Sequence, residues 1–253
     1  MTDQRDFFRK VEREYWTEAE GLKGEEQALI ERHLEPELPT LDAGTGGGRI
    51  PRALTAKGFA RITGFDFAPE LVEAARRSVP EGTIAFDVAD ATALPYGDAS
   101  FGQVLYLQQV ICTIDDEAGR AAALREAARV LRPGGVALFS FVCLESRLAS
   151  AAQRAYVAYL RAVRALRRDR RPLQSMPRLR LRGRFDPGAL RDAGPYNWWY
   201  RAGEAEAALS AAGFEVEAIG FRPDAGGLEP TGVEALADGA DGTLYAVARR
   251  PSV

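Results

Sequence analysis

The sequence predicts an α/β fold built on a mostly parallel sheet. Between residues 38 and 142, short apolar runs alternate with longer helical patterns, which is typical of βαβ units. The chain has 253 residues, of which 46% are hydrophobic, so it can bury one full core. We therefore expect a single domain over residues 1–253.

The expected strands are apolar runs bounded by glycine, proline or charged residues. They are 40–44, 60–66, 83–88, 102–108, 135–142, 214–221 and 242–249. Helical spacing of apolar residues predicts helices over 48–57, 69–78, 116–131, 146–170 and 202–212. The last two strands are expected to pair as an antiparallel hairpin at one edge of the sheet.

Two segments lie outside this alternation. Residues 1–35 are predicted to form a helical cap of two helices, and residues 143–200 an insertion on the substrate side. The insertion carries ten arginines between Arg161 and Arg184. Arginine suits carboxylates and phosphates, but the chain has thirty arginines and three lysines throughout, so this bias needs no local explanation. Anion binding by the insertion is kept as an alternative hypothesis.

Composition excludes several classes of protein. A net charge of −3 gives no general attraction to nucleic acid, and no run of 18 apolar residues could span a bilayer. Met1–Lys10 lacks the apolar run of a signal peptide, so we expect a cytoplasmic protein. Cys112 and Cys143 lie in apolar runs and are expected as buried thiols. With His33 as the single histidine, no metal site is expected.

The stretch "LDAGTGGGRI" places four glycines between a predicted strand and a predicted helix. A dinucleotide fingerprint would need a third glycine where this chain has Arg49. Instead Gly44, Gly46 and Gly48 alternate after Asp42. Such a turn brings main-chain amides close to a ligand, and the carboxylate favours a nearby positive charge. The pattern indicates a nucleoside that carries an amino acid.

Two further acids follow the next two strands. Asp66, 18 residues after Gly48, can accept hydrogen bonds from both hydroxyls of a ribose, or can cap the helix that follows. Asp90 can accept from the exocyclic amine of adenine, with the main-chain amide of Ala91 beside a ring nitrogen. Acids after three consecutive strands predict one shared nucleoside site.

These motifs resemble the class I S-adenosylmethionine-dependent methyltransferases. The matching stretches are "LDAGTGGGR", "GFDFAPELVEAAR", "VADATALPYGDASFGQVLYLQ" and "EAARVLRPGGVALFSF". The resemblance implies a Rossmann-like three-layer sandwich with sheet order 3-2-1-4-5-7-6, the seventh strand antiparallel. It also implies S-adenosylmethionine as cofactor and S-adenosylhomocysteine as product. The cofactor-binding residues implied are Tyr15, Asp42, Gly44, Thr45, Gly46, Gly48, Asp66, Phe67, Asp90, Ala91 and Gln108.

The resemblance assigns parts of the cofactor to these positions. The three alternating glycines would contact the methionine part, and Asp42 its ammonium group. Gln108, at the end of the fourth strand, would lie near the sulfonium. The chain departs from the family at Gly102, where an acid is common, and "QQVICTI" lacks the histidines that some relatives have.

No catalytic base is evident from the sequence. Weak candidates near strand ends are Tyr106, Gln109 and Glu145; His33 is unique but lies on an ordinary amphipathic helix pattern. Aromatic residues of the cap and the insertion are candidates for acceptor contact, or simply for anchoring these segments on the core. The substrate-binding candidates are Trp16, Gln109, Trp198, Trp199 and Tyr200.

The function expected is methyl transfer to an oxygen or nitrogen of a small-molecule acceptor, aromatic or anionic. Two alternatives remain: a tRNA or other RNA methyltransferase that uses the arginine-rich insertion, and a cofactor-binding protein without catalysis. The sequence does not indicate the acceptor or the oligomeric state.

Overall fold

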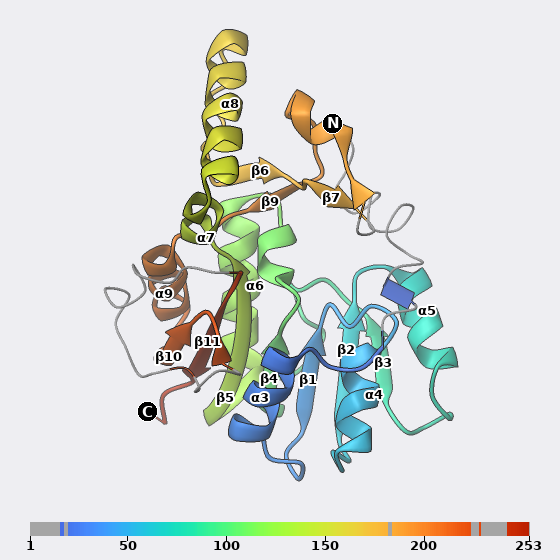
Figure 1. Ribbon diagram of the computed structural model, residues 1–253. Helices are drawn as coiled ribbons and strands as arrows, with labels where there is room; N and C mark the ends of the chain where they lie inside the picture. Colours follow the sequence, from blue (N-terminus) through green and yellow to red (C-terminus); the bar gives the residue numbers. More distant parts are fainter. Residues whose placement is uncertain (1–15, 18–19, 182–183, 224–227, 229–241, 253) are drawn as a thin grey trace.

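The fold is centred on one mixed sheet of seven strands (Figure 1). The structure, a computed structural model, describes residues 16–17, 20–181, 184–223, 228 and 242–252. Within them the order is β3-β2-β1-β4-β5-β11-β10. The strands are β1 (Thr40–Ala43), β2 (Ile62–Asp66), β3 (Ala85–Val88), β4 (Phe101–Tyr106), β5 (Leu131–Val142), β10 (Glu215–Gly220) and β11 (Thr243–Arg249).

All neighbouring strands pair in parallel except β11, which is antiparallel to both β5 and β10. Counted along these seven strands alone, the order is the expected 3-2-1-4-5-7-6. The α/β fold class and the antiparallel hairpin at the edge are confirmed.

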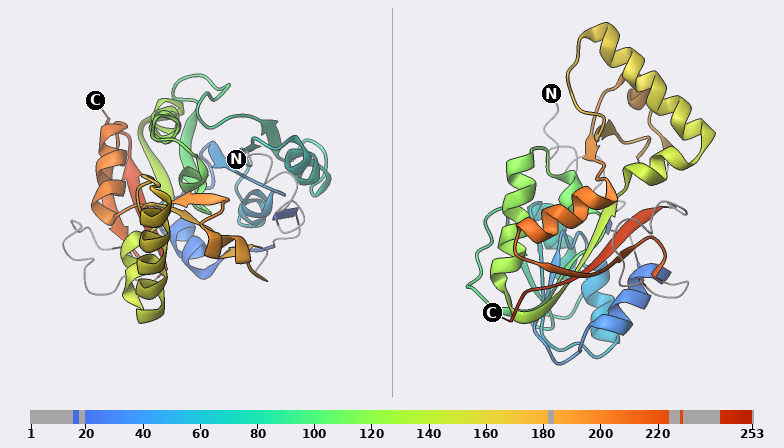
Figure 2. Two further views of the ribbon diagram at one scale, coloured as in Figure 1. Left: turned by 90° about the horizontal axis from the view of Figure 1, so that it is seen from above. Right: turned by 90° about the vertical axis from the view of Figure 1, so that its left-hand side faces the viewer.

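Helices cover both faces of the sheet (Figure 2). One face packs against apolar side chains of three helices, α3 (Gly24–His33), α4 (Arg49–Ala56) and α5 (Pro69–Arg77). The other packs against α6 (Glu117–Val130) and α9 (Ala202–Ala211). The sandwich therefore has the three expected layers. Residues 1–15, most of the first helix predicted in the cap, lie outside the described part of the chain.

The predicted helix over 146–170 is instead two helices. α7 (Leu144–Ala149) ends at Ser150, whose side chain accepts a hydrogen bond from the amide of Gln153 and so begins α8 (Ala151–Arg167). Serine is a preferred residue at the start of a helix, because its side-chain oxygen accepts a hydrogen bond from an amide that has no partner within the helix. Helix α8 projects away from the sheet (Figures 1 and 2).

Short elements complete the segment between β5 and α9. They are β6 (Ser175–Pro177), β7 (Arg180–Leu181), β8 (Arg184–Phe185), the 3-10 helix η2 (Pro187–Arg191) and β9 (Tyr196–Trp198). Strand β6 pairs with β9, and β7 with β8, both antiparallel. A small apolar cluster of its own, around Leu160 and Met176, supports this segment.

A buried ion pair joins the last turn of α8 to the residue that follows η2. The Arg164 guanidinium bonds both carboxylate oxygens of Asp192, at 2.7 and 2.9 Å, and also donates to the carbonyl of Pro172 at 2.8 Å. Arg171 adds a bond of 2.9 Å to the same carboxylate. Because each charge has a close partner, burial here is tolerated, and α8 is fixed to the loops before β6 and after η2.

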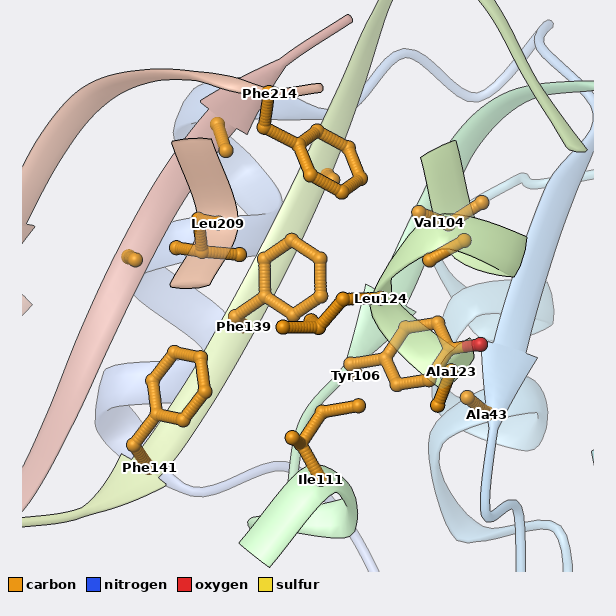
Figure 3. Close-up of a cluster of buried hydrophobic side chains, with 14 of the residues drawn as sticks. Ala43, Val104, Tyr106, Ile111, Ala123, Leu124, Phe139, Phe141, Leu209 and Phe214 are labelled. Atoms are coloured by element: carbon orange, nitrogen blue, oxygen red, sulfur yellow. The ribbon is translucent and has the colours of Figure 1, made fainter. Parts of the chain in front are cut away.

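The core beneath the carboxyl ends of the strands is rich in aromatic rings (Figure 3). Tyr106 of β4 stacks on Phe139 of β5 with ring centroids 5.5 Å apart, and Phe139 meets Phe214 edge-on at 5.3 Å. Cys112 and Cys143 are buried and unpaired, as expected. No helix in the described ranges is long and apolar enough to cross a membrane.

We expect Asp192→Asn to destabilise the insertion by about 3–5 kcal/mol, because it leaves the charge of Arg164 buried without its partner. Asparagine tolerates the left-handed backbone of this residue (φ 49°), so the charge is the main change. Hydrogen exchange of α8, followed by mass spectrometry, measures the effect. The matched control is Asp169→Asn, which breaks a more exposed pair with Arg171 and should cost below about 1 kcal/mol. Equal protection of α8 in both variants would contradict this account.

Candidate active site

The turn between β1 and α4 exposes its main chain to a pocket, because its glycines have no side chains. Gly44, Gly46 and Gly48 all have positive φ, at 62°, 55° and 83°. A Cβ atom at Gly44 would lie 2.7 Å from Cγ2 of Val110, so no larger residue fits there. Glycine alone combines this conformation with so close an approach. The sequence at this turn is therefore dictated by both backbone and space.

Asp66 holds this turn to the end of β2. Its Oδ2 accepts from the amide of Gly46 and its Oδ1 from the amide of Ala68, both at 3.0 Å. Burial raises the pKa of Asp66 to about 6, while these amides oppose the shift. Each carboxylate oxygen can accept a second hydrogen bond, so the residue can organise the turn and bind a ligand hydroxyl as well.

Asp90 and Ala91 lie on the loop after β3, against the same pocket. The Oδ1 atom of Asp90 accepts from the amide of Thr92 at 2.9 Å and from its hydroxyl at 2.8 Å. These bonds fix the loop and leave the main chain at Ala91 facing the pocket.

The side chains of Asp42 and Thr45 are buried, and their oxygen atoms make no hydrogen bond. Neither carboxylate oxygen of Asp42 has a partner, and the Thr45 hydroxyl has none. Burial raises the pKa of Asp42 to about 7; the neighbouring Thr45 hydroxyl and the Arg49 guanidinium oppose the shift, and Glu26 adds to it. An unpaired buried carboxylate is costly, and a cation bound at the turn would relieve that cost.

The pocket beside the turn has a volume of about 620 Å³. Its walls come from the glycine turn, the ends of β2 and β3, the segment that follows β4, and the start of α6. The lining residues are Trp16, Gly44, Gly46, Phe65, Asp66, Phe67, Leu71, Ala89, Asp90, Ala91, Thr92, Gln108, Val110, Thr113, Ile114, Asp115, Asp116, Ala118, Gly119, Ala122, Arg125 and Arg178.

Seven of the eleven residues expected to bind cofactor line this pocket. They are Gly44, Gly46, Asp66, Phe67, Asp90, Ala91 and Gln108. Asp42, Thr45 and Gly48 belong to the same turn but do not reach the pocket surface, and Tyr15 lies outside the described residues.

Gln108 is held by the helix that precedes β1. Its Nε2 donates to Oε1 of Glu26, and its Oε1 accepts from Nζ of Lys23 at 3.2 Å. Glu26 also forms a bidentate pair with Arg49, at 2.7 and 3.0 Å. Sequence reasoning missed this network because Glu26 and Gln108 are 82 residues apart and no local pattern joins them.

Trp16 covers the glycine turn. Its main-chain oxygen accepts from the amide of Gly47 at 3.1 Å, and its side chain lines the pocket. A Cβ atom at Gly47 would lie 2.8 Å from that oxygen and from Cα of Thr17. The fourth glycine of the turn is thus explained by the cap segment that rests on it.

The structure places three of the base candidates away from the pocket. Tyr106 is wholly buried in the aromatic core, and burial raises its pKa (Figure 3). His33 ends α3 at the opposite edge of the sheet, near Glu217 and Arg249, and burial lowers its pKa. Glu145 accepts from Sγ of Cys143 at 3.0 Å, outside the pocket.

Gln109 faces away from the pocket although it is adjacent to Gln108. Its side-chain Nε2 reaches the hydroxyl of Thr243 on β11 at 3.5 Å, and its amide donates to Ser140 at 2.9 Å. Consecutive residues with left-handed backbones at 108 and 109 turn the two side chains apart.

The aromatic residues before α9 anchor the insertion. Trp198 donates to Glu204 at 2.9 Å, Trp199 lies under the guanidinium of Arg147 at 4.6 Å, and Tyr200 is buried in the main core. None of these three rings lines the pocket. Of the acceptor-binding candidates, Trp16 alone does.

A second wall of the pocket was not predicted from the sequence. It is formed by the 3-10 helix η1 (Val110–Thr113) and the first turns of α6, whose small residues Ala118, Gly119 and Ala122 share one helical face. Arg178 reaches the pocket from the insertion, with its Nε bonded to Asn197 at 3.0 Å. The described residues contain no group of three or more acids, cysteines or histidines able to hold a metal ion.

Comparisons with known proteins agree with this geometry. A family model described as a methyltransferase domain matches residues 41–139. A solved S-adenosylmethionine-dependent methyltransferase from Methanosarcina mazei superposes with a TM-score of 0.65 and 20% identity, over 88% of this chain and 97% of that one. Residues 41–139 thus match a methyltransferase domain, and the fold of the chain is that of S-adenosylmethionine-dependent methyltransferases.

Curated relatives match this chain over part of their own length. An O-methyltransferase of Penicillium expansum is 37% identical over 98 residues, 37% of this chain and 34% of the relative. The 27-O-demethylrifamycin SV methyltransferase of Amycolatopsis mediterranei is 32% identical over 143 residues, 52% and 51% of the two chains. The chain thus spans a third to a half of these two relatives.

The residues present fit the cofactor that this family and fold imply, S-adenosylmethionine. The turn lines the pocket with glycines, Asp66 and Asp90 line it after β2 and β3, and the buried carboxylate of Asp42 lacks a hydrogen-bond partner. The binding residues named from the sequence remain proposals, now with seven of them assembled in one place.

Asp42 should make the stability of the protein depend on pH. Its pKa is raised from 3.8 to about 7, so its favourable contribution is full below about pH 4 and is lost as the pH rises through 7. Relative to wild type, Asp42→Asn should therefore gain in free energy of unfolding from pH 4 to pH 8. Urea unfolding of both proteins without cofactor measures this difference. A difference that stays constant with pH would contradict the account.

Proposed function

We propose that this chain transfers a methyl group from S-adenosylmethionine to an oxygen or nitrogen atom of a small-molecule acceptor. The observation that carries the proposal is the pocket of about 620 Å³, which joins the candidate cofactor residues to a second wall of η1 and α6. Its volume falls within the roughly 300–1,000 Å³ of small-molecule sites. A donor and a compact acceptor can share it.

The sulfonium group of the cofactor supplies an electrophilic methyl carbon, so the protein's main task is alignment. The glycine turn, Asp66 and Asp90 are placed to fix the donor, and Trp16 lies over the turn. Orientation of two reactants can supply about 7–11 kcal/mol of the barrier in favourable cases.

The acidic residues of the second wall limit the choice of acceptor. Asp116 accepts from the amide of Gly119 at 2.7 Å and so caps α6, while Asp115 lies beside it. No histidine lines the pocket. An acceptor that needs little help from a base fits best, such as an amine or an acidic phenol or enol. The names of the two relatives, both acting on oxygen, favour a hydroxyl group.

The positions of the arginines support a small molecule over RNA. Arg164 and Arg171 are engaged with Asp192 inside the insertion, and Arg167 donates to the carbonyl of Arg191. Of the insertion's described arginine side chains, Arg178 alone lines the pocket, where it could meet an anionic group of the acceptor.

The direct test is formation of S-adenosylhomocysteine from S-adenosylmethionine with a panel of phenols, enols, alcohols and amines. We expect turnover with at least one phenol or enol. Tight binding of S-adenosylhomocysteine without turnover on any panel member would favour a non-catalytic binding protein. Methylation of RNA, with binding that weakens steeply as salt rises, would favour the RNA alternative.

We expect Asp66→Ala to weaken binding of S-adenosylhomocysteine at least about tenfold, because a ribose partner and a bond that holds the glycine turn are both lost. Asp66→Asn, which keeps one acceptor oxygen, should lose less. Asp98→Ala removes an exposed acid remote from the pocket and controls for net charge. Isothermal titration calorimetry gives the three affinities. Unchanged affinity in Asp66→Ala would count against the proposed cofactor site.

A further inference from the structure

The strongest unexplained feature near the pocket is the buried carboxylate of Glu26. It is fully buried and accepts from the amide of Lys23 at 2.9 Å, from Nη1 and Nη2 of Arg49 at 2.7 and 3.0 Å, and from Nε2 of Gln108. Arg49 adds a bond of 2.6 Å to the carbonyl of Gly21. The pair is therefore fixed by hydrogen bonds to Lys23, Gln108 and Gly21 as well as by its own contact.

Three charged side chains thus gather beneath the glycine turn. Arg49 begins α4 directly after the turn, Glu26 pairs with it, and Asp42 lies at the end of β1 without a hydrogen-bond partner. Both Arg49 and Glu26 act electrostatically on the Asp42 carboxylate. When all three side chains are ionised, the sum of their charges is −1. The charges of Arg49 and Glu26 cancel, so the net charge resides on Asp42.

We propose that Glu26 is a positioning residue that determines cofactor specificity. Because it neutralises the charge of Arg49, the carboxylate of Asp42 stays available to attract the ammonium group of the cofactor. The inference rests on the cofactor site of the proposed function. Without Glu26, the guanidinium of Arg49 would lose this carboxylate partner, and its charge would act on Asp42 without that compensation. In a buried site of low dielectric, that pairing would remove the attraction for a cationic ligand.

Three ligands distinguish an effect of Glu26 on the ammonium subsite from a general effect on the structure of the pocket. S-adenosylhomocysteine carries both an ammonium and a carboxylate, its decarboxylated analogue keeps the ammonium alone, and 5′-methylthioadenosine has neither. We expect Glu26→Gln to weaken the first two about tenfold, or ~1.4 kcal/mol, and to leave 5′-methylthioadenosine unchanged. Isothermal titration calorimetry on the full chain measures all three.

Two further variants make the test specific. Glu25→Gln, one residue earlier on α3, changes the net charge equally without touching Arg49 and should bind all three ligands as wild type does. Glu26→Gln combined with Arg49→Gln removes both charges and should restore much of the binding of the decarboxylated analogue.

Equal weakening of all three ligands by Glu26→Gln would overturn the proposal, since that result would mean a structural role for Glu26. Unchanged binding of all three, or no recovery in the double variant, would overturn it as well. Failure of the wild-type chain to bind any of the three would refute the cofactor site of the proposed function itself, and this role of Glu26 with it.

Discussion

The parallel pairing of β1 with β2 on one side and β4 on the other is the constraint on which the site depends. Asp42 lies opposite Gly64 of β2 and Leu105 of β4. Because the three strands run in the same direction, the glycine turn, Asp66 and Gln108 arrive at one edge of the sheet. Gly64 permits this closeness, since a Cβ there would lie 2.7 Å from the hydroxyl of Thr45.

The sheet could be predicted from the sequence because its evidence is local. Each strand is an apolar run with a clear boundary, and the strand order followed from the resemblance. The small strands of the insertion could not be predicted, since two or three residues carry no periodicity and their pairing depends on distant partners. Gly102 stands where the family commonly has an acid, and steric crowding explains the glycine, because a Cβ there would lie 3.0 Å from Leu38.

The candidate site was predictable where residues follow strands, and not where side chains meet from distant segments. Asp66 and Asp90 line the pocket because the fold brings the ends of β2 and β3 there. The sequence could not predict which way the side chain of Tyr106 points. Strand β4 is buried along its whole length, so no alternation of apolar and polar residues indicates which side chains face a ligand. The Glu26–Arg49 pair depends on helix α3 docking against the turn, which no short motif encodes.

Polar and charged side chains of the cap and insertion mostly serve to fix structure. The Arg164–Asp192 pair shapes the insertion, and the Glu26–Arg49 pair fixes α3 beside the turn. The pocket itself is lined by the main chain of the turn, by Asp66 and Asp90 after β2 and β3, and by the wall of η1 and α6, with Asp42 buried behind the turn. Under the proposed function, one half of the pocket would hold the donor and the other the acceptor.

The central claim is that this pocket binds the cofactor at the ends of β1 to β4. A crystal structure with S-adenosylhomocysteine tests it most directly. We predict the adenine beside Asp90 and Ala91, the ribose on Asp66 and the amino-acid end at the glycine turn. The cavity left over should lie against η1 and α6. Density for the ligand elsewhere, with this pocket empty, would contradict the account.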